Sequence, residues 1–283
     1  MKWLLFCFFY SISLLTNGQS KTDANTIFVC IPKEDYAALF SNSFIKDTLF
    51  VCKENTTKTN KDEYTGKYYI GEFATLEFFQ PNGNKKFGDN LQDFGIEFKA
   101  RKIGYLDSIQ KQKKDTKLVL EKTYLDSGNT SDLWYSAVKT TGNKSNSEIS
   151  IIEYSADYLK MLGFTEEQLL LSISPAEFNK IVYGTSKYPR KFQSITTISI
   201  EVNTQGWHYL KKVAATLGYT LHQDYLQCDG FQIYYTKNKK LPKTLLKEIT
   251  VQLNQNFSNR IIPISANLSI SISKDTAKLL FQS

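Results

Sequence analysis

Two glutamates, Glu77 and Glu153, occupy similar places in strand-like runs of the sequence. Glu77 lies in the run 75–79 and Glu153 in the run 149–154, and aromatic and aliphatic residues flank both. A carboxylate that faces a partly apolar pocket has a raised pKa, which suits a general base near neutral pH. The alternation of side chains along the first run favours such a pocket. An outward position at a strand edge, paired with a lysine, is the alternative for either glutamate.

The two histidines of the chain, His208 and His222, do not complete a catalytic pattern. His208 shares a predicted helix face with Lys211 and Lys212, opposite an apolar stripe, as is typical of a solvated side chain. His222 lies in a short predicted strand, and its role stays open. No Ser-His-Asp, His-x-His or His-Glu-x-x-His pattern can be built from them, so a Ser or Cys hydrolase would lack a base.

Three cysteines, Cys30, Cys52 and Cys228, follow the N-terminal segment that contains Cys7. None of them stands in the Cys-x-x-Cys spacing of a metal site, and an odd number permits at most one internal disulfide. Cys30 and Cys52 lie in apolar strand-like runs, which favours small buried side chains over a disulfide.

Aromatic residues are concentrated between positions 64 and 79. Tyr68 and Phe79 are the candidates for contacts with a ligand. Aromatic stripes in strands are, however, more often part of the core than of a binding site.

The elements that must position these residues form an internal repeat. Each copy predicts a strand, an amphipathic helix and three further strands. The first copy comprises the runs 27–31, 36–40, 49–52, 68–70 and 75–79, and the second comprises 94–98, 103–109, 118–124, 133–138 and 149–154. The order is β-α-β-β-β in both.

Helix signals replace the strand pattern between residues 157 and 194. Thr165 with Gln168 and Ser174 with Glu177 each fit a capping box, which predicts two helix starts. A third unit follows, with a strand at 198–202, a helix around 207–217, three further strands, and a last strand near 268–272. The Asp229-Gly230 pair predicts a hairpin turn in this unit.

Paired β-α-β-β-β units that each end in a strand with a central Glu resemble the vicinal oxygen chelate, or glyoxalase-like, superfamily. The stretch 64–71 leading to 76–79 is also similar to uncharacterised exported glyoxalase-like proteins. The resemblance covers residues 25–156 and, more loosely, 195–254. It implies an α+β fold in which repeated modules form a curved mixed sheet, with a helical insert and a third related module. The expected domains are therefore 25–156, the connector 157–194 and the module 195–283.

The resemblance also bears on metal binding. Metal enzymes of this superfamily place a His at the start of each unit's first strand and a Glu in its last strand. Glu77 and Glu153 match the Glu positions, but Asn25-Thr26 and Gln92-Asp93 stand where the His ligands would be. Sites for zinc, nickel or iron favour at least one imidazole. We therefore expect no tightly bound transition metal and no cofactor.

Residues 1–19 have the order of a cleavable signal peptide: Lys2, an apolar run at 3–15, and small or polar residues up to position 20. The apolar run is shorter than the roughly 20 residues of a membrane-spanning helix. We expect export to the periplasm or the exterior, with no stable membrane span after cleavage. An uncleaved anchor is the alternative.

The net charge of +7 does not point to nucleic acid, because the basic residues are spread out and local clusters occur only near 111–114 and 237–240. The leading hypothesis is an exported protein that holds a small organic molecule in a cupped sheet. It would be a binding protein, or a metal-independent lyase or isomerase with Glu77 or Glu153 as base. A non-enzymatic interaction or structural protein of the cell envelope is the alternative, and it would be favoured if aromatic side chains filled the cup. The oligomeric state stays open.

Overall fold

The computed structural model describes residues 21–83, 86–112, 118–126, 130–184 and 190–282. The predicted signal peptide at 1–19 lies outside these residues. Among the helices that are described, none is long and apolar enough to cross a membrane.

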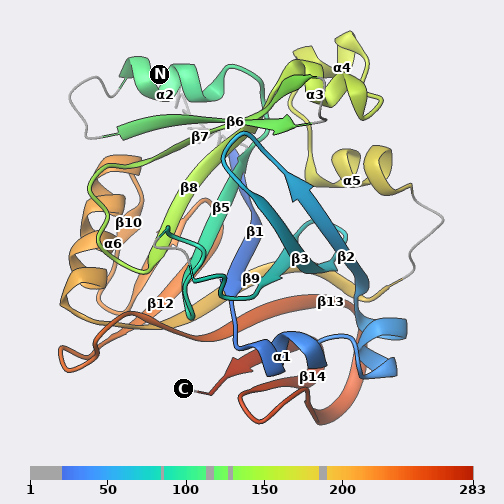
Figure 1. The fold of residues 1–283 in the computed structure, drawn as a ribbon, viewed down its shortest axis with the longest axis vertical. Helices are drawn as coiled ribbons and strands as arrows, with labels where there is room; N and C mark the ends of the chain where they lie inside the picture. Colours follow the sequence, from blue (N-terminus) through green and yellow to red (C-terminus); the bar gives the residue numbers. More distant parts are fainter. Residues whose placement is uncertain (1–20, 84–85, 113–117, 127–129, 185–189, 283) are drawn as a thin grey trace, which may run out of the picture.

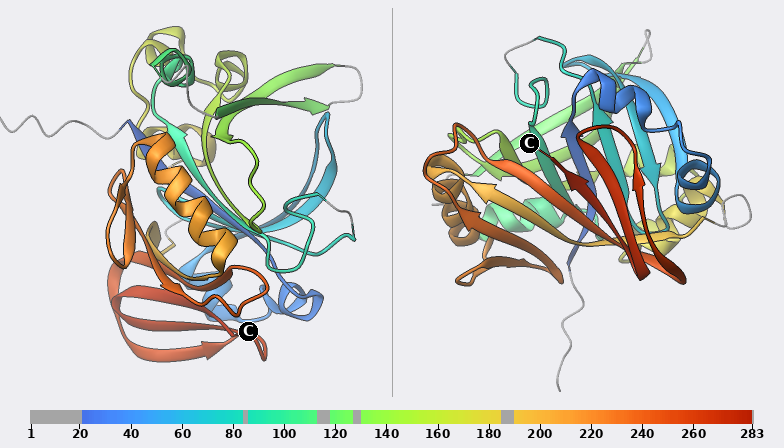
Figure 2. Two further views of the ribbon diagram at one scale, coloured as in Figure 1. Left: turned by 90° about the vertical axis from the view of Figure 1, so that its left-hand side faces the viewer. Right: turned by 90° about the horizontal axis from the view of Figure 1, so that it is seen from below.

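Eight strands form one curled sheet in the order β2-β3-β4-β1-β5-β8-β7-β6 (Figures 1 and 2). The strands are β1 (Thr22–Cys30), β2 (Val51–Lys58), β3 (Glu63–Ile70), β4 (Thr75–Phe79), β5 (Phe94–Ala100), β6 (Leu118–Asp126), β7 (Ser131–Thr140) and β8 (Ser147–Tyr154). Helix α1 (Lys33–Ala38) and a short π-helix (Ile45–Leu49) follow β1, and α2 (Tyr105–Gln112) follows β5. The pattern confirms the two predicted β-α-β-β-β units.

The pairing of the strands repeats between the two units. Strand β1 runs parallel to β4, β5 runs parallel to β8, and β1 and β5 pair antiparallel at the centre of the sheet. The sheet is therefore curled about the pair β1 and β5, and its last strands β4 and β8 flank that pair. This is the glyoxalase-like fold class expected from the sequence.

The two edge strands of the curled sheet meet at one end. Thr59 forms an isolated antiparallel bridge with Leu125, and the Asn60 amide donates to the Tyr124 carbonyl oxygen at 3.0 Å. The Lys58 ammonium lies 3.2 Å from the Asp126 carboxylate. These contacts link β2, with the turn that follows it, to β6.

A second sheet has the order β10-β11-β12-β9-β13-β14. Its elements are β9 (Phe192–Val202), α6 (Thr204–Leu217), β10 (Thr220–Leu221), β11 (Tyr225–Cys228), β12 (Phe231–Lys237), β13 (Leu245–Pro263) and β14 (Leu268–Phe281). Strands β9 to β12 repeat the order β1 to β4, with β9 parallel to β12, so the third module is confirmed. Asp229 and Gly230 form the expected turn, with φ of 38° and 85°.

Three short helices lie between the two sheets in the sequence: α3 (Ala156–Met161), α4 (Glu166–Leu170) and α5 (Pro175–Tyr183). Both predicted capping boxes are present, at Thr165 with Gln168 and at Ser174 with Glu177. The hydroxyl of each N-cap residue accepts a backbone N–H that the first turn would otherwise leave unpaired.

The convex face of the curled sheet packs on the second sheet and α6. The Phe98 ring lies 5.5 Å from the Tyr219 ring and 5.9 Å from the Phe231 ring. The Ile149 amide donates to the Tyr209 hydroxyl at 2.7 Å. Apolar burial of this kind is the main stabilising contribution to a fold, and here it leaves the concave face available for a site.

Candidate functional site

Strand register places a set of side chains on the concave face. Aligned residues on paired strands point to the same side of a sheet. Glu77 is aligned with Phe28 on β1 and with Tyr68 on β3, while Glu97 is aligned with Thr26 on β1. The rest of this face follows by alternation and register: Tyr64, Gly66, Phe79, Gly95, Lys99, Tyr135, Lys139, Glu148 and Ser150.

Two glycines make room for aromatic rings on this face. A Cβ atom at Gly95 would lie 2.1 Å from Cε1 of Phe28, so the Phe28 ring occupies the place of a side chain on β5. A Cβ atom at Gly66 would lie 2.6 Å from Cε1 of Phe79. Neither position tolerates a larger residue unless the ring moves.

The Phe79 ring is the centre of an aromatic wall along β1, β3 and β4. Its centroid lies 5.5 Å from that of Tyr64 and 6.4 Å from those of Tyr68 and Phe28, all in edge-to-face geometry. Phe87, from the loop between β4 and β5, meets Phe28 at 5.7 Å. Aromatic pairs in this geometry form a well-defined apolar surface.

Glu77 and Glu97 form an interacting carboxyl pair beside this wall. Burial raises the pKa of Glu77 to about 8, and the neighbouring Glu97 carboxylate adds to that rise. Burial also raises the pKa of Glu97 to about 7, with a further contribution from Glu148 that Lys139 partly offsets. Two such carboxyl groups hold and exchange protons at neutral pH, as acid–base catalysis requires.

A chain of ion pairs forms the opposite wall. The Lys139 ammonium lies 3.1 Å from both the Glu148 and the Glu121 carboxylates. Glu121 also pairs at 3.2 Å with Lys61, which comes from the turn between β2 and β3. Burial works to lower the pKa of Lys139, but the two carboxylates outweigh it and raise that pKa. Lys139 therefore stays positively charged at neutral pH, with the carboxylates of Glu121 and Glu148 beside it.

Two phenols lie within electrostatic reach of the pair. Burial raises the pKa of Tyr64, and Glu77 contributes to that rise. Burial likewise raises the pKa of Tyr135, with a contribution from Glu97. Both hydroxyls therefore stay protonated at neutral pH and can donate a hydrogen bond.

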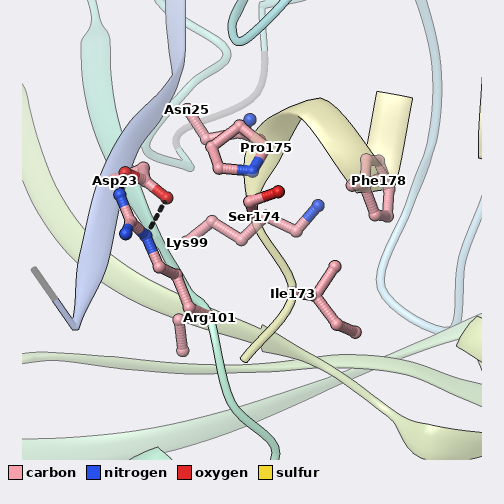
Figure 3. A pocket seen from close by; sticks show the side chains of 9 residues that line it. Asp23, Asn25, Lys99, Arg101, Ile173, Ser174, Pro175 and Phe178 are labelled. Atoms are coloured by element: carbon pink, nitrogen blue, oxygen red, sulfur yellow. Dashed lines mark hydrogen bonds and ion pairs between the residues drawn. The ribbon is translucent and has the colours of Figure 1, made fainter. Parts of the chain in front are cut away.

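A lysine marks the far end of the concave face. Nζ of Lys99 is buried, lies 2.9 Å from the centroid of the Phe178 ring, and has no hydrogen-bond partner in the described part of the chain. Burial lowers the pKa of Lys99 well below its ordinary value, against an opposing contribution from Asp23. A small cavity of about 10 Å³ lies beside it, between Asn25 and Ser174 (Figure 3).

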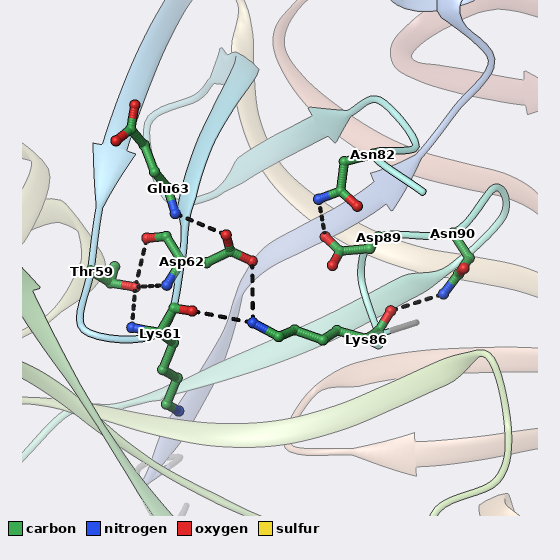
Figure 4. Close-up of polar contacts among 8 residues, drawn as sticks. All are labelled: Thr59, Lys61, Asp62, Glu63, Asn82, Lys86, Asp89 and Asn90. Atoms are coloured by element: carbon green, nitrogen blue, oxygen red, sulfur yellow. Dashed lines mark hydrogen bonds and ion pairs between the residues drawn. The ribbon is translucent and has the colours of Figure 1, made fainter. Parts of the chain in front are cut away.

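The loop between β4 and β5 is tied to the turn between β2 and β3 (Figure 4). The Lys86 ammonium donates to the Lys61 carbonyl oxygen at 3.2 Å and lies 3.8 Å from the Asp62 carboxylate. Asn82 and Asp89 close the loop on itself with a side-chain hydrogen bond of 2.6 Å. Phe87 is thereby held over one end of the aromatic wall.

Three of the four residues expected at the site, Glu77, Tyr68 and Phe79, lie together on the concave face. Glu153 lies on the opposite face of β8, where its carboxylate accepts from the backbone amides of Gly104 at 2.9 Å and Leu106 at 3.0 Å. It thus holds the start of α2.

Three other glutamates of the face, Glu97, Glu121 and Glu148, were not predicted from the sequence. Glu97 stands in the run 94–98, directly after the small residue Gly95 in the alternation of that strand. A glycine inside a strand often marks a place where another group approaches closely. Gly95, two positions before Glu97 on the same strand face, could therefore have pointed to a site.

The donor set does not fit the metal centre of the superfamily. Thr26, Phe28 and Gly95 occupy the concave positions of β1 and β5 beside the Glu77 and Glu97 pair. Within the described ranges, no three His, Cys, Asp or Glu side chains are arranged to hold a metal ion. His208 is exposed, and His222 is exposed and stacks on Tyr225 in the second sheet.

The described cysteines, Cys30, Cys52 and Cys228, are free thiols. Burial raises the pKa of Cys30 and of Cys52 to about 12, so both are protonated and poorly nucleophilic at neutral pH.

Residues 24–281 match a family of unknown function, DUF5829. None of the curated proteins compared with the chain matches it.

Several solved structures are similar in fold. A hypothetical protein from Staphylococcus aureus superposes with a TM-score of 0.53 at 10% identity, covering 85% of this chain and 94% of its own. A mutant of 4-hydroxymandelate synthase from Streptomyces coelicolor gives a TM-score of 0.45 at 9% identity, with 81% and 70% covered. A fusion of a xylose isomerase-like TIM barrel with 4-hydroxyphenylpyruvate dioxygenase gives 0.44 at 8% identity, with 82% and 36% covered.

Proposed function

We propose that this chain, which belongs to the family of unknown function DUF5829, binds a small organic molecule on the concave face of its curled sheet. The observation that carries the proposal is the Glu77 and Glu97 pair, held between an aromatic wall and a wall of ion pairs. Pockets for small molecules combine an apolar lining with a few convergent polar groups in this way. The repeated-module topology supports placing the chain in the vicinal oxygen chelate superfamily.

The exposure of the concave side chains favours ligand binding over a purely structural role. Phe28, Glu77, Phe79 and Glu97 each keep part of their surface exposed. A face filled by aromatic packing, as an envelope structural protein would have, leaves such residues fully buried. The exposed parts are instead the places where a ligand would make contact.

Proton transfer is the chemistry that the site supports best. One glutamate of the pair removes a proton from a carbon next to a carbonyl group, and the phenol of Tyr64 or Tyr135 donates to the carbonyl oxygen as negative charge develops there. A pKa near 7 to 8 suits this base at physiological pH. No step uses a metal. Return of the proton to the neighbouring carbon would complete an isomerisation, and loss of a leaving group from the β-carbon would complete a lyase reaction, in either case on a small carbonyl compound.

A thermal-shift screen of small carbonyl and carboxylate compounds tests the proposal. Wild type is compared with Glu77→Gln and Glu97→Gln, and with Glu153→Gln as the matched control on the other face of the sheet. We expect hits on wild type and on Glu153→Gln, with the shift lost or reduced at least by half in the two concave variants. Equal shifts in all four proteins would remove the pair from the site.

Export is a separate part of the proposal, and it rests on residues 1–19 of the sequence. Protein isolated from its native host is expected to begin between Gly18 and Lys21. N-terminal sequencing checks this, and mature material that retains Met1 would contradict it.

A further inference from the structure

A second cavity lies away from the glutamate pair, where the end of β1 and the start of α1 meet strands β13 and β14. Its volume is about 200 Å³. The first module and the last strands of the chain therefore enclose it together. Residues from both lie on its wall, including Ile31, Asp35, Leu246, Asn267, Phe281 and Gln282.

Asp35 is the unusual residue of this cavity. It is 3% exposed, yet its Oδ1 atom has no hydrogen-bond partner among the described residues. A buried carboxylate without a partner is costly, because it loses its hydration and gains no compensating bond. Asp35 is one of the residues that line the cavity, so its side chain favours a positively charged group inside that cavity.

The rest of the lining restricts the kind of cation. Ile31, Leu246 and Phe281 supply apolar surface, while the exposed residues Asn267 and Gln282 supply amide groups. Calcium and magnesium sites are built mainly of oxygen ligands with several carboxylates or waters, whereas this wall offers one carboxylate next to apolar surface. An ammonium group on a short carbon chain matches both parts of the lining, since its charge meets Asp35 and its carbons meet the apolar wall.

We propose that this cavity binds a small organic ammonium compound, with Asp35 as its counter-ion. The site is separate from the one proposed on the concave face, and neither proposal depends on the other. A bound ammonium group would supply a positive charge beside the buried Asp35 side chain, which has no ion-pair partner among the described residues.

Calorimetry with n-butylammonium chloride tests the charge requirement. Neutral n-butanol is the matched probe, and sodium chloride at equal ionic strength is the salt control. Wild type is expected to bind butylammonium at least about tenfold more tightly than butanol, since a buried charged hydrogen bond exceeds a neutral one by that much or more. Asp35→Asn is expected to abolish the preference, and Glu34→Gln, which alters the exposed neighbouring carboxylate, to preserve it.

Three results of the binding measurements would overturn the inference. The first is equal affinity for butylammonium and butanol in wild type. The second is unchanged butylammonium binding in Asp35→Asn. The third is loss of binding in Glu77→Gln, because that result would place the cation on the concave face instead.

The stability of the free protein gives an independent check. If Asp35 is kept for a ligand and not for the fold, ligand-free Asp35→Asn should melt at the same temperature as wild type or at a higher one. A clearly lower melting temperature would mean that the fold itself uses the carboxylate, and it would contradict the inference.

Discussion

Glu77 and Glu97 are held close enough on the concave face for each to affect the proton affinity of the other. Each has a folded-state pKa above its ordinary value of 4.5, at about 8 and about 7. Below pH 4.5 both carboxyl groups are protonated in the folded and in the unfolded chain. Their contribution to the stability of the fold is then fully present. Between pH 4.5 and 8 the unfolded chain ionises first, so stability falls as the pH rises.

Replacing one member of the pair should weaken this pH dependence. Urea denaturation at pH 5 and pH 8 is expected to show wild type losing several kcal/mol over the interval. Glu77→Gln should lose clearly less, because the amide does not ionise. A variant with the same loss as wild type would contradict the assignment of the raised pKa to this pair.

Gly95 and Phe28 form a second testable pair. Gly95→Ala places a Cβ atom against the Phe28 ring, and overpacking of this kind typically costs about 1–3 kcal/mol. Phe28→Leu should relieve the clash, so the double variant should be more stable than the sum of the single changes predicts. Additive changes in the free energy of unfolding would mean that the ring does not rest on Gly95.

Strand alternation explains how far the site could be predicted at this scale. Glu77 and Phe79 are two positions apart, so they lie on the same face of the sheet, whether that face is concave or convex. In β8 the residues 149–152 include isoleucines on both faces, so the apolar pattern could not say which face is concave. Glu148 and Glu153 lie on opposite faces of that strand, and only the packed sheet distinguishes them.

At the scale of single elements, Glu153 links β8 to α2. Glu153→Ala removes the acceptor of two backbone amides in the first turn of the helix. Loss of a capping acceptor typically costs about 1 kcal/mol, so the denaturation midpoint should fall while any ligand-induced thermal shift stays unchanged. Loss of ligand binding at unchanged stability would instead support a role for Glu153 in the site.

Local signals predicted the helix starts and the Asp229-Gly230 turn because each depends on residues a few positions apart. The length of β13 could not be predicted in this way. Its stretch 254–260 is polar apart from Phe257, so it shows no apolar alternation. It is extended because it pairs with β14, which lies later in the chain.

At the scale of the molecule, the two sheets share one core and should unfold together. The ring of Phe98 on β5 packs on residues of the second sheet, so neither sheet can separate without exposing apolar surface. Beyond residue 3, the tryptophans are Trp134 on β7 and Trp207 on α6, one for each sheet.

Single-tryptophan variants of the chain without residues 1–19 can therefore report the unfolding of each sheet separately. Trp207→Phe leaves a probe in the curled sheet, and Trp134→Phe leaves one beside the second sheet. In each variant, fluorescence and circular dichroism are expected to give the same denaturant midpoint, as in a two-state transition. Separate midpoints within one variant would mean that the sheets unfold independently.

The contact between β2 and β6 has a consequence for self-association. Unpaired strand edges are templates on which another chain can add a strand, and that is a common start of aggregation. Here the bridge between Thr59 and Leu125, with the Lys58 and Asp126 pair beside it, lets the two edges of the curled sheet protect each other where they meet. The same closure that shapes the concave face therefore keeps part of the sheet from recruiting a neighbouring molecule.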